Sequence, residues 1–466
     1  MPIFIYNSLT RKKDKFIPVN GRKVNMYTCG VTVYDACHIG HARSLFIFNL
    51  IRRYLKYRGF AVNFVRNITD IDDKIINRAH ELKIDWKELV AKYIVSYNQD
   101  LELLGVEKGD FEPRATENIS EMIEYIKVLI NKGFAYASAG DVYFDVRKFK
   151  AYGKLSGQSI DAMHTGVRIE LAESKNDPLD FALWKRSKEN EPFWPSPWGN
   201  GRPGWHIECS VMSQKFLKTS TLDIHAGGRD LIFPHHENEL AQSEAYTGKL
   251  FTKYWMHHGL LTINAQKMSK SLGNFVTLKD FIAKYHNPEL LKFFFSTAHY
   301  SHAIDYNDGK IEEAKQALQR INIFMGKAKS AKPGFTVVFL KLIPKEIALL
   351  RTKFMASLDD DFNTPEALAC VFELVNLGNK NISNNNFVYS AKNVLNEMLE
   401  ILGISLKSVK IDQEMNEFEI KLKIQSRVDA KKAKDYALAD QIRKELESKG
   451  IILEDTKEGA TWRRKL

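Results

Sequence analysis

The sequence predicts an α/β protein that begins with a parallel β-sheet and ends in helices. Residues 24–104 alternate between strand-like and helix-like patterns, and this order is typical of a parallel sheet. Helical periodicity dominates after Asn287. With 466 residues, of which 44% are hydrophobic, the chain is long enough for about two to four domains and a large core.

The first hundred residues carry the pattern of the sheet. Residues 1–23 are expected to form an irregular arm with a turn at residues 19–22. A short strand is predicted at residues 24–28 and a helix at residues 42–58, where apolar residues recur at mostly helical spacing. A second strand at residues 62–65 leads into a polar stretch, and a helical pattern then continues to about Leu104. Ligands of open α/β sheets bind at this carboxyl end of the strands.

The middle of the chain predicts an insertion into this sheet. A break at Glu112-Pro-Arg-Ala-Thr116 is followed by a predicted helix from Ile119 to Asn131 and by strands at residues 135–136 and 142–144. Glycine- and serine-rich turns separate these elements. Residues 191–203 are dense in Pro, Trp and Gly and are predicted to form a loop.

The remainder predicts helices and a small terminal module. Residues 346–404 show the apolar spacing of a helical bundle, with an Asn/Ser-rich loop at residues 378–386. A charged helix is expected at residues 416–449, followed by the apolar residues Ile451-Ile-Leu453 and a basic end at residues 462–465.

The charge, the cysteine count and the apolar runs of the sequence limit the kinds of function that the protein can have. The chain has 68 basic and 57 acidic residues, a formal charge of +11, and residues 1–66 hold twelve Lys/Arg against only Asp14 and Asp35. This excess fits nucleic-acid binding, although a solvated basic face would have the same composition. Four cysteines do not make a disulfide scaffold, so a reduced, cytoplasmic protein is expected. We expect no membrane span, because no apolar run reaches about 20 residues. We also expect no signal peptide, because Met1-Pro-Ile-Phe4 is followed by polar residues.

His38-Ile-Gly-His41 lies where the first predicted strand turns into a helix. A helix start presents unpaired N–H groups and a positive dipole end to an anion, and Gly40 allows a ligand close to the backbone. These features suggest a nucleotide-phosphate site. The alternative is an ordinary strand–helix turn in which the histidines have no special role.

A second candidate phosphate element is the loop Lys267-Met-Ser-Lys-Ser-Leu-Gly-Asn274. Lys267 and Lys270 are three residues apart, and their mobile positive charges suit a polyphosphate. On its own the loop is equally compatible with a solvated basic turn.

Four distant residues could hold a metal. If residues 234–245 form a helix that starts at Pro234, His235 and Glu239 are at positions i and i+4 and share a face. With Cys29 and Cys209 they offer four ligands that suit tetrahedral zinc. The alternative is a buried apolar cysteine and a polar helix start. Cys37 and Cys370 receive no role, and Cys370 falls in the apolar pattern of the bundle.

Taken together, these motifs resemble a known family. His38-Ile-Gly-His41 and Lys267-Met-Ser-Lys-Ser271 match both signatures of class I aminoacyl-tRNA synthetases, and the chain resembles the cysteinyl-tRNA synthetases among them. The similar stretches cover the chain from about residue 27 to its end. They are Cys29-Gly-Val-Thr-Val-Tyr-Asp35, Asn67-Ile-Thr-Asp-Ile-Asp-Asp-Lys74, Glu112-Pro-Arg-Ala-Thr116, Asp177-Pro-Leu-Asp-Phe181, Gly204-Trp-His-Ile-Glu-Cys-Ser210, Phe233-Pro-His-His-Glu-Asn-Glu239, Asp359-Asp-Asp-Phe-Asn-Thr-Pro365 and Trp462-Arg-Arg-Lys465.

The resemblance implies a Rossmann-type catalytic domain with an inserted connective domain, followed by an α-helical bundle and a small α+β anticodon-binding domain. The expected domains are the first half of the catalytic domain (1–115), the connective insertion (116–195), the second half with the lysine loop (196–295), a stem-contact region (296–345), the helical bundle (346–404) and the anticodon-binding domain (405–466).

The resemblance also implies an activity, ATP-dependent activation of L-cysteine and its transfer to tRNA(Cys), by a cytoplasmic protein that is expected to be a monomer. Mg²⁺ would accompany ATP. The implied catalytic residues are His38, His41, Lys267 and Lys270. ATP would contact Gly40, Gly227, Gly228, Asp230 and Lys270. The substrate cysteine would contact Thr69 and Trp205. One Zn²⁺ would be held by Cys29, Cys209, His235 and Glu239. Arg427, Asp440, Asp455 and Trp462 are candidates for reading the anticodon, or are ordinary surface residues of a small domain.

Two departures from the family pattern and two alternative functions remain open. Ala226 and Asn264-Ala-Gln266 stand where glycine-containing sequences are usual, and both lie beside the expected nucleotide site. One alternative is a ligase that joins cysteine to an amino sugar, which would lack the anticodon module that residues 405–466 resemble. The other is a non-catalytic, zinc-stabilised RNA-binding protein, against which the two intact signatures argue.

Overall fold

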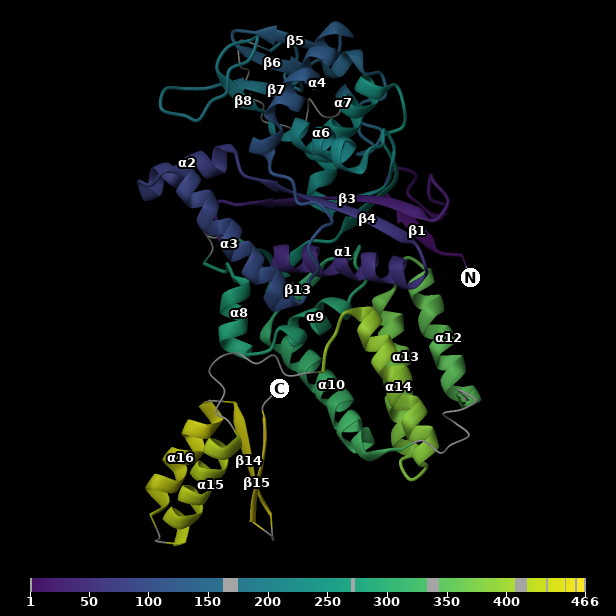
Figure 1. The fold of residues 1–466 in the computed structure, drawn as a ribbon, viewed down its shortest axis with the longest axis vertical. Helices are drawn as coiled ribbons and strands as arrows, with labels where there is room; N and C mark the ends of the chain where they lie inside the picture. The colour runs from purple at the N-terminus through teal and green to yellow at the C-terminus, as the bar shows by residue number, and fades with distance from the viewer. Residues whose placement is uncertain are drawn as a thin grey trace.

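A computed structural model describes residues 2–161, 175–269, 273–332, 343–406, 417–432, 435–448, 450–456 and 459–464. At its centre is a four-stranded sheet in the order β10-β9-β3-β4, and every pairing in it is parallel (Figure 1). The predicted parallel sheet is therefore confirmed. The strands predicted at residues 24–28 and 62–65 are both present and longer than predicted, as β3 and β4. The four strands are β3 (Lys23–Thr32), β4 (Ala61–Thr69), β9 (Leu222–Gly228) and β10 (Thr252–His258).

Helices cover both faces of this sheet. Helix α1 (Ile39–Tyr57) connects β3 to β4 on one face, and α6 (Trp205–Leu217) and α7 (Glu237–Thr247) lie on the other (Figure 1). The predicted single helical pattern up to Leu104 is two helices, α2 (Asp73–Leu82) and α3 (Trp86–Leu104). Lys83 adopts φ 53° and ends α2, and the Asp85 side chain caps α3.

The insertion forms a sheet of its own. Helix α4 (Ile119–Asn131) has the predicted bounds, and the antiparallel sheet β5-β6-β7-β8 is separate from the parallel one. The prediction of a loop at residues 191–203 is wrong for its C-terminal end, because Gly201–Pro203 forms β8. Proline is tolerated there because an edge strand leaves one side unpaired. The strands are β5 (Ala135–Ser138), β6 (Asp141–Phe144), β7 (Phe181–Arg186) and β8 (Gly201–Pro203).

The N-terminal arm is a hairpin, so the prediction of an irregular arm is wrong. Strands β1 (Phe4–Asn7) and β2 (Lys12–Lys15) pair antiparallel. Ile3 and Ile5 are buried, whereas β2 is mainly exposed and rich in lysine, which hid the strand pattern. The Ser8 N–H donates to the carbonyl of Trp255 and thereby ties the arm to β10.

A small sheet carries the lysine loop. Its strands are β11 (Leu261–Ile263), β12 (Gln266–Lys267) and β13 (Ile304–Tyr306), in the order β12-β11-β13. Asn264 and Ala265 form the β11–β12 turn with φ of 50° and 61°, a conformation that glycine adopts at lower cost. Three helices follow or flank this sheet, α8 (Leu278–Tyr285), α9 (Pro288–Ser296) and α10 (Asp308–Lys327).

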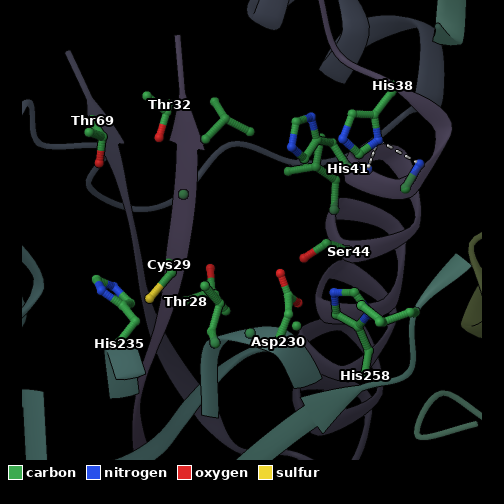
Figure 2. A pocket seen from close by; sticks show the side chains of 18 of the residues that line it. Thr28, Cys29, Thr32, His38, His41, Ser44, Thr69, Asp230, His235 and His258 are labelled. Carbon is green, nitrogen blue, oxygen red and sulfur yellow. Dashed lines mark hydrogen bonds between the residues drawn. The ribbon is translucent and has the colours of Figure 1, made fainter. Parts of the chain in front are cut away.

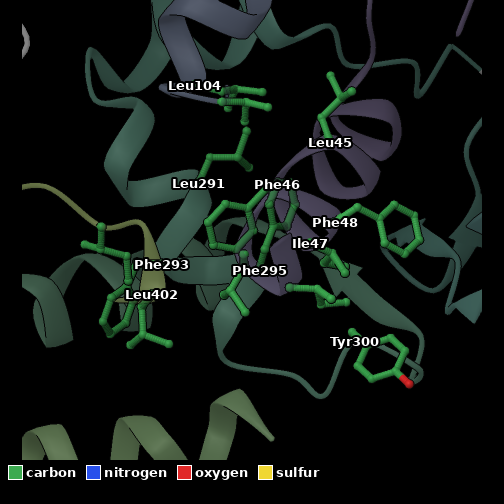
Figure 3. Packing of buried hydrophobic residues seen from close by; sticks show 14 of the residues in the cluster. Leu45, Phe46, Ile47, Phe48, Leu104, Leu291, Phe293, Phe295, Tyr300 and Leu402 are labelled. Carbon is green, nitrogen blue, oxygen red and sulfur yellow. The ribbon is translucent and has the colours of Figure 1, made fainter. Parts of the chain in front are cut away.

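The predicted bundle is present and shares a core with the catalytic part. It consists of α12 (Lys345–Asp359), α13 (Thr364–Lys380) and α14 (Asn385–Leu402). Figure 3 shows Phe46 of α1, Phe293 and Phe295 of α9 and Leu402 of α14 in one cluster of buried side chains. Cys37 and Cys370 are buried in the same core. No helix among the described residues is long and apolar enough to cross a membrane.

The C-terminal module has two helices where one was predicted. These are α15 (Glu417–Lys432) and α16 (Tyr436–Ser448), followed by the antiparallel pair β14 (Ile451–Thr456) and β15 (Gly459–Arg464). Asp435 accepts a hydrogen bond from the Leu438 N–H at 3.0 Å and thus starts the second helix. A separate apolar core, which includes Ile420 and Leu446, holds the module together. Short helical turns occur at η1 (Ala115–Asn118), η2 (Val146–Lys148), η3 (Arg229–Leu231), η4 (Ile232–His236) and η6 (Ala328–Ser330).

One buried carboxyl group of this fold predicts a pH-dependent stability. Asp100 of α3 is 1% exposed, its Oδ1 has no partner among the described residues, and burial raises its pKa to about 6. Because the pKa of an unfolded aspartate is about 3.9, this group destabilises the fold increasingly as the pH rises from about 4 to about 6. We expect Asp100→Asn to stabilise the protein by about 2 kcal/mol at pH 7.5 and hardly at all at pH 4. Thermal melts at both pH values check this, and an equal gain at both would contradict it.

Candidate active site

A cavity of about 480 Å³ lies at the carboxyl edge of the parallel sheet (Figure 2). It brings together nearly all the predicted substrate and metal residues. At one end are Cys29, Thr69, Trp205, Cys209 and His235. At the other are His38, Gly40, His41, Gly227, Gly228, Asp230 and Lys267. Glu239 is fully buried and contacts Cys29, and Lys270 lies outside the described residues.

His38 caps the helix that it starts. Its Nδ1 accepts hydrogen bonds from the N–H groups of Gly40 (3.1 Å) and His41 (3.2 Å). The Ile39 N–H donates to the Val276 carbonyl at 3.1 Å. The expectation of unpaired N–H groups at this helix start is therefore wrong, because a side chain of the motif itself satisfies them. Since Nδ1 is the acceptor, the neutral ring carries its proton on Nε2 and is a hydrogen-bond donor there.

Gly40 is required by this cap. A Cβ at Gly40 would lie 2.9 Å from the His38 ring. The His41 ring stacks on that of His38 with centroids 3.6 Å apart. Burial lowers the pKa of His38 to about 4, and burial together with the charge of its neighbours lowers the pKa of His41 well below its usual value. Both rings are therefore neutral near pH 7 and would contact phosphate by hydrogen bonding rather than by charge.

The four predicted metal ligands converge from three parts of the chain. Cys29 comes from β3, Cys209 from α6, and His235 and Glu239 from the turn that leads into α7 and from α7 itself. Their donor atoms all lie within 4.8 Å of one another. The predicted i, i+4 relation is present, with 2.9 Å between His235 Nε2 and Glu239 Oε1.

Three donor-to-donor distances that involve sulfur fit tetrahedral zinc. With bonds of about 2.3 Å to sulfur and about 2.0 Å to nitrogen, zinc separates two sulfurs by about 3.8 Å and sulfur from nitrogen by about 3.5 Å. The two Sγ atoms are 3.8 Å apart, and Cys209 Sγ is 3.7 Å from His235 Nε2. Cys29 Sγ is 3.6 Å from Glu239 Oε1. Two thiols, an imidazole and a carboxylate are a donor set that suits this ion.

The surroundings hold the ligands in place. His235 Nδ1 is 2.9 Å from His206 Nδ1, and the Trp205 ring stacks on His235 at 3.9 Å. His225 Nε2 is 2.8 Å from Glu239 Oε2, so the two oxygens of this carboxylate face different histidines. Such outer contacts orient metal ligands.

Protonation within the cluster is uneven. Burial and the neighbouring Cys209 and Glu239 raise the pKa of Cys29 well above its usual value. For Cys209, burial raises the pKa but hydrogen bonds from Cys29 and His235 outweigh it, and the pKa falls to about 6. Burial opposes ionisation of Glu239, yet His225 and His235 lower its pKa to about 2. Burial opposes protonation of His235, but Glu239 and Cys209 raise its pKa to about 9. These shifts favour the ionised forms of Cys209 and Glu239 and the protonated forms of Cys29 and His235.

Sequence reasoning missed several histidines of this site. His236 Nε2 is 3.2 Å from Cys29 Sγ, and its Nδ1 is 2.8 Å from His257 Nε2. Cys29, His225, His236 and Glu239 form a second group of donors close enough to hold a metal. The only sequence signal for His236 was its position next to His235, and no motif indicated a role for His225 or His257.

The predicted cysteine contact Thr69 and the predicted ATP contact Gly227 both line the cavity. The Thr69 hydroxyl donates to Glu208 Oε2 at 2.9 Å and accepts from Asn67 at 3.2 Å. Gly227 has no room for a side chain, because a Cβ would lie 2.8 Å from His236. Ala226, the first departure from the family pattern, is buried within β9 and pairs with Met256.

Lys267 is exposed at the end of β12. Asn274 closes the lysine loop by accepting from the Ser269 N–H at 2.8 Å and donating to the Lys267 carbonyl at 3.2 Å. The loop is therefore held at its two ends.

The four anticodon candidates all belong to the C-terminal module, away from the cavity. Arg427 is buried, Asp440 is exposed, and Trp462 packs partly buried against the core of the module. Asp455 lies on β14, and its side chain is outside the described part of the structure. Their role stays a prediction.

Comparison with known proteins agrees with these features. Residues 15–316 match the family "tRNA synthetases class I (C) catalytic domain", and residues 353–407 match the DALR domain. The chain is 49% identical to the cysteine--tRNA ligase of Clostridioides difficile (strain 630), over 99% of both chains. It is 48% identical to that of Geobacillus thermodenitrificans (strain NG80-2), again over 99% of both.

Solved structures share the fold at low sequence identity. Mycobacterium tuberculosis methionyl-tRNA synthetase in complex with methionyl-adenylate superposes with a TM-score of 0.60 at 15% identity, covering 82% of this chain and 90% of that one. The Agrobacterium radiobacter K84 agnB2 LeuRS–tRNA–LeuAMS complex gives 0.60 at 9% identity, with 83% and 85% covered. Because two family models and full-length relatives near 49% identity agree with the geometry, the chain belongs to the cysteine--tRNA ligase family of class I aminoacyl-tRNA synthetases.

Proposed function

We propose that the protein activates L-cysteine with ATP and transfers it to the 3′ end of tRNA(Cys). This proposal rests on one observation: a single cavity brings together two cysteines and other candidate metal ligands, a helix start capped by a histidine, and the start of a lysine loop. In the first step the cysteine carboxylate attacks the α-phosphate of ATP and pyrophosphate leaves. In the second step a hydroxyl of the 3′-terminal ribose attacks the cysteinyl carbonyl and AMP leaves. Both steps need positioning and charge stabilisation from the protein.

One end of the cavity would select the amino acid. Cys29, Cys209, His235 and Glu239 would hold Zn²⁺, and Trp205 and Thr69 would contact the substrate around it. When bound, zinc favours a soft thiolate over a hydroxyl, which supplies the discrimination between cysteine and serine that size alone does poorly.

The other end would hold ATP, with its Mg²⁺. His38 would donate Nε2–H to phosphate while its Nδ1 keeps the helix capped, and His41 would line the same space. Lys267, with Lys270, would stabilise charge on the α-phosphate and the leaving pyrophosphate. Gly40, Gly227 and Gly228 would leave room for the nucleotide, and Asp230 would contact its ribose.

The remaining proposals concern the whole protein. We propose that the chain divides into the six domains predicted from its sequence. Arg427, Asp440, Asp455 and Trp462 are candidates for anticodon reading. We also propose that the protein is a cytoplasmic monomer. The DALR match supports a distinct helical bundle before the last module. Two rivals are a cysteine–amino sugar ligase and a zinc-stabilised RNA binder without catalysis.

Isotope exchange separates these functions. We expect cysteine-dependent ATP–pyrophosphate exchange, together with charging of a tRNA(Cys) transcript, because both halves of the reaction share the cavity. Exchange without charging would favour the amino sugar ligase. No exchange at all would leave only an RNA binder.

The metal assignment predicts different behaviour for neighbouring histidines. His235→Ala is expected to lower the bound zinc from one per chain by at least tenfold and to weaken discrimination against serine, because His235 supplies a ligand. His236→Ala removes a donor of the second cluster only, so the variant is expected to retain zinc. Elemental analysis of the purified variants and serine-dependent exchange check this. Zinc loss from His236→Ala with retention by His235→Ala would assign the metal to the other cluster.

The two roles of His38 can be separated by substitution. Asparagine caps helices well but places no donor where Nε2 lies, whereas alanine also loses the cap. We expect pyrophosphate exchange to fall by about 10²–10³ in both His38→Asn and His38→Ala, while only His38→Ala loses about 1 kcal/mol of stability. Exchange rates and thermal melts measure the two effects. Normal exchange in His38→Asn would show that capping is the only role of this residue.

A further inference from the structure

A hydrogen-bond acceptor at the nucleotide end of the cavity has so far received no role. His258 is the last residue of β10 and lines the cavity, although it is only 7% exposed. Its Nδ1 lies 2.9 Å from the Gly259 carbonyl oxygen, which can only accept a hydrogen bond. The proton of the neutral ring is therefore on Nδ1, and Nε2 is a bare acceptor.

Nothing else in the described structure occupies this acceptor. The structure shows a hydrogen bond at Nδ1 and none at Nε2 within the described residues. Burial and the nearby Arg43 lower the pKa of His258 to about 4, so the ring stays neutral and keeps its lone pair. Arg43 donates to the carbonyls of Gly259 (2.6 Å) and Leu260 (3.1 Å), which holds the chain beyond the histidine in place.

A second acceptor, which also lines the cavity, lies near His258 Nε2. A Cβ built on Gly228 would lie 2.4 Å from Asp230 Oδ1 and 3.6 Å from His258 Nε2. Asp230 Oδ1 therefore takes the place that a side chain at residue 228 would occupy, and the two acceptors lie at most about 6 Å apart. Figure 2 shows Asp230 and His258 next to each other at the cavity edge, below Ser44 of α1.

Two converging acceptors call for a ligand with two adjacent donors. ATP carries such a pair in the 2′- and 3′-hydroxyl groups of its ribose, and its phosphates carry none. We propose that His258 accepts a hydrogen bond from one ribose hydroxyl of ATP while Asp230 accepts from the other, so that His258 helps the site to distinguish ribonucleotides from deoxyribonucleotides. This inference rests on the proposed function only in taking ATP as the nucleotide.

Calorimetric titration of ATP, 2′-deoxyATP and 3′-deoxyATP, without cysteine or tRNA, tests the proposal. The unaltered protein is expected to bind one of the deoxy analogues about tenfold more weakly through loss of the His258 contact. In His258→Asn the side-chain amide can still donate to the Gly259 carbonyl but does not reach the position of Nε2. This variant is expected to bind ATP about tenfold more weakly than the unaltered protein does. It is also expected to lose the preference for ATP over the deoxy analogue that the unaltered protein binds more weakly. In His258→Gln the amide oxygen reaches the Nε2 position, so the preference returns at least in part.

Controls separate this contact from damage to the fold. His286→Asn changes a histidine outside the cavity, at φ 52° where asparagine is tolerated, and is expected to bind all three nucleotides as the unaltered protein does. If His258→Asn does not fold, His258→Met carries the same expectation, because it also lacks the acceptor. The proposal is overturned if the unaltered protein binds both deoxy analogues as tightly as ATP, or if the preference survives in His258→Asn or His258→Met. Absence of cysteine-dependent exchange would overturn the proposed function but not this inference, since nucleotide binding is measured by itself.

Discussion

Parallel pairing of four strands is the constraint on which the site depends. Because β3, β4, β9 and β10 run in one direction, their carboxyl ends meet at one edge. Thr69 ends β4, Gly228 ends β9 and His258 ends β10, although they are far apart in sequence. Strand β3, one of the two inner strands, supplies Cys29 and leads into α1, so a short segment contributes residues to both ends of the cavity.

Burial of polar groups gives the site its chemistry. His235, Glu239 and Cys209 are almost completely buried, and each would be costly there without the others. Their contacts compensate this cost. They lower the pKa of Cys209 and Glu239 but raise that of Cys29 and His235, so a metal, which binds thiolate and neutral imidazole, would displace protons from these two residues. At the other end of the cavity, burial lowers the pKa of His38 and His258 and keeps both rings neutral. His38 Nδ1 accepts two hydrogen bonds and His258 Nδ1 donates one, so the Nε2 atoms of the two rings are a donor and an acceptor, respectively.

Much of this was predictable from sequence, and the failures have physical reasons. The parallel sheet and helix α4 follow from periodicity. The four candidate metal ligands follow from the family resemblance, and the structure brings their donor atoms together. The hairpin arm was missed because lysines on its exposed strand hide the alternation of apolar and polar residues. The break between α15 and α16 was missed because the capping residue Asp435 is a weak sequence signal for the start of a helix. The roles of the rings at 225, 236 and 258 depend on which atom faces which neighbour, and no sequence pattern encodes that.

Helix α1 explains why the bundle and the site share one core. At its start His38 caps the helix, and about 28 Å further on its last turns are attached to the bundle. The Tyr54 hydroxyl donates to Asp359 of α12 at 2.7 Å, and that of Tyr57 donates to Glu397 of α14 at 2.6 Å. Glu397 also accepts two hydrogen bonds from Arg351 at 2.7 Å each, which fixes its position. Since a helix of this length is stiff, these contacts and the aromatic core around Phe46 restrict its tilt. The direction in which His38 and His41 face the cavity is therefore set by packing throughout the helix, and not by the strand–helix turn alone.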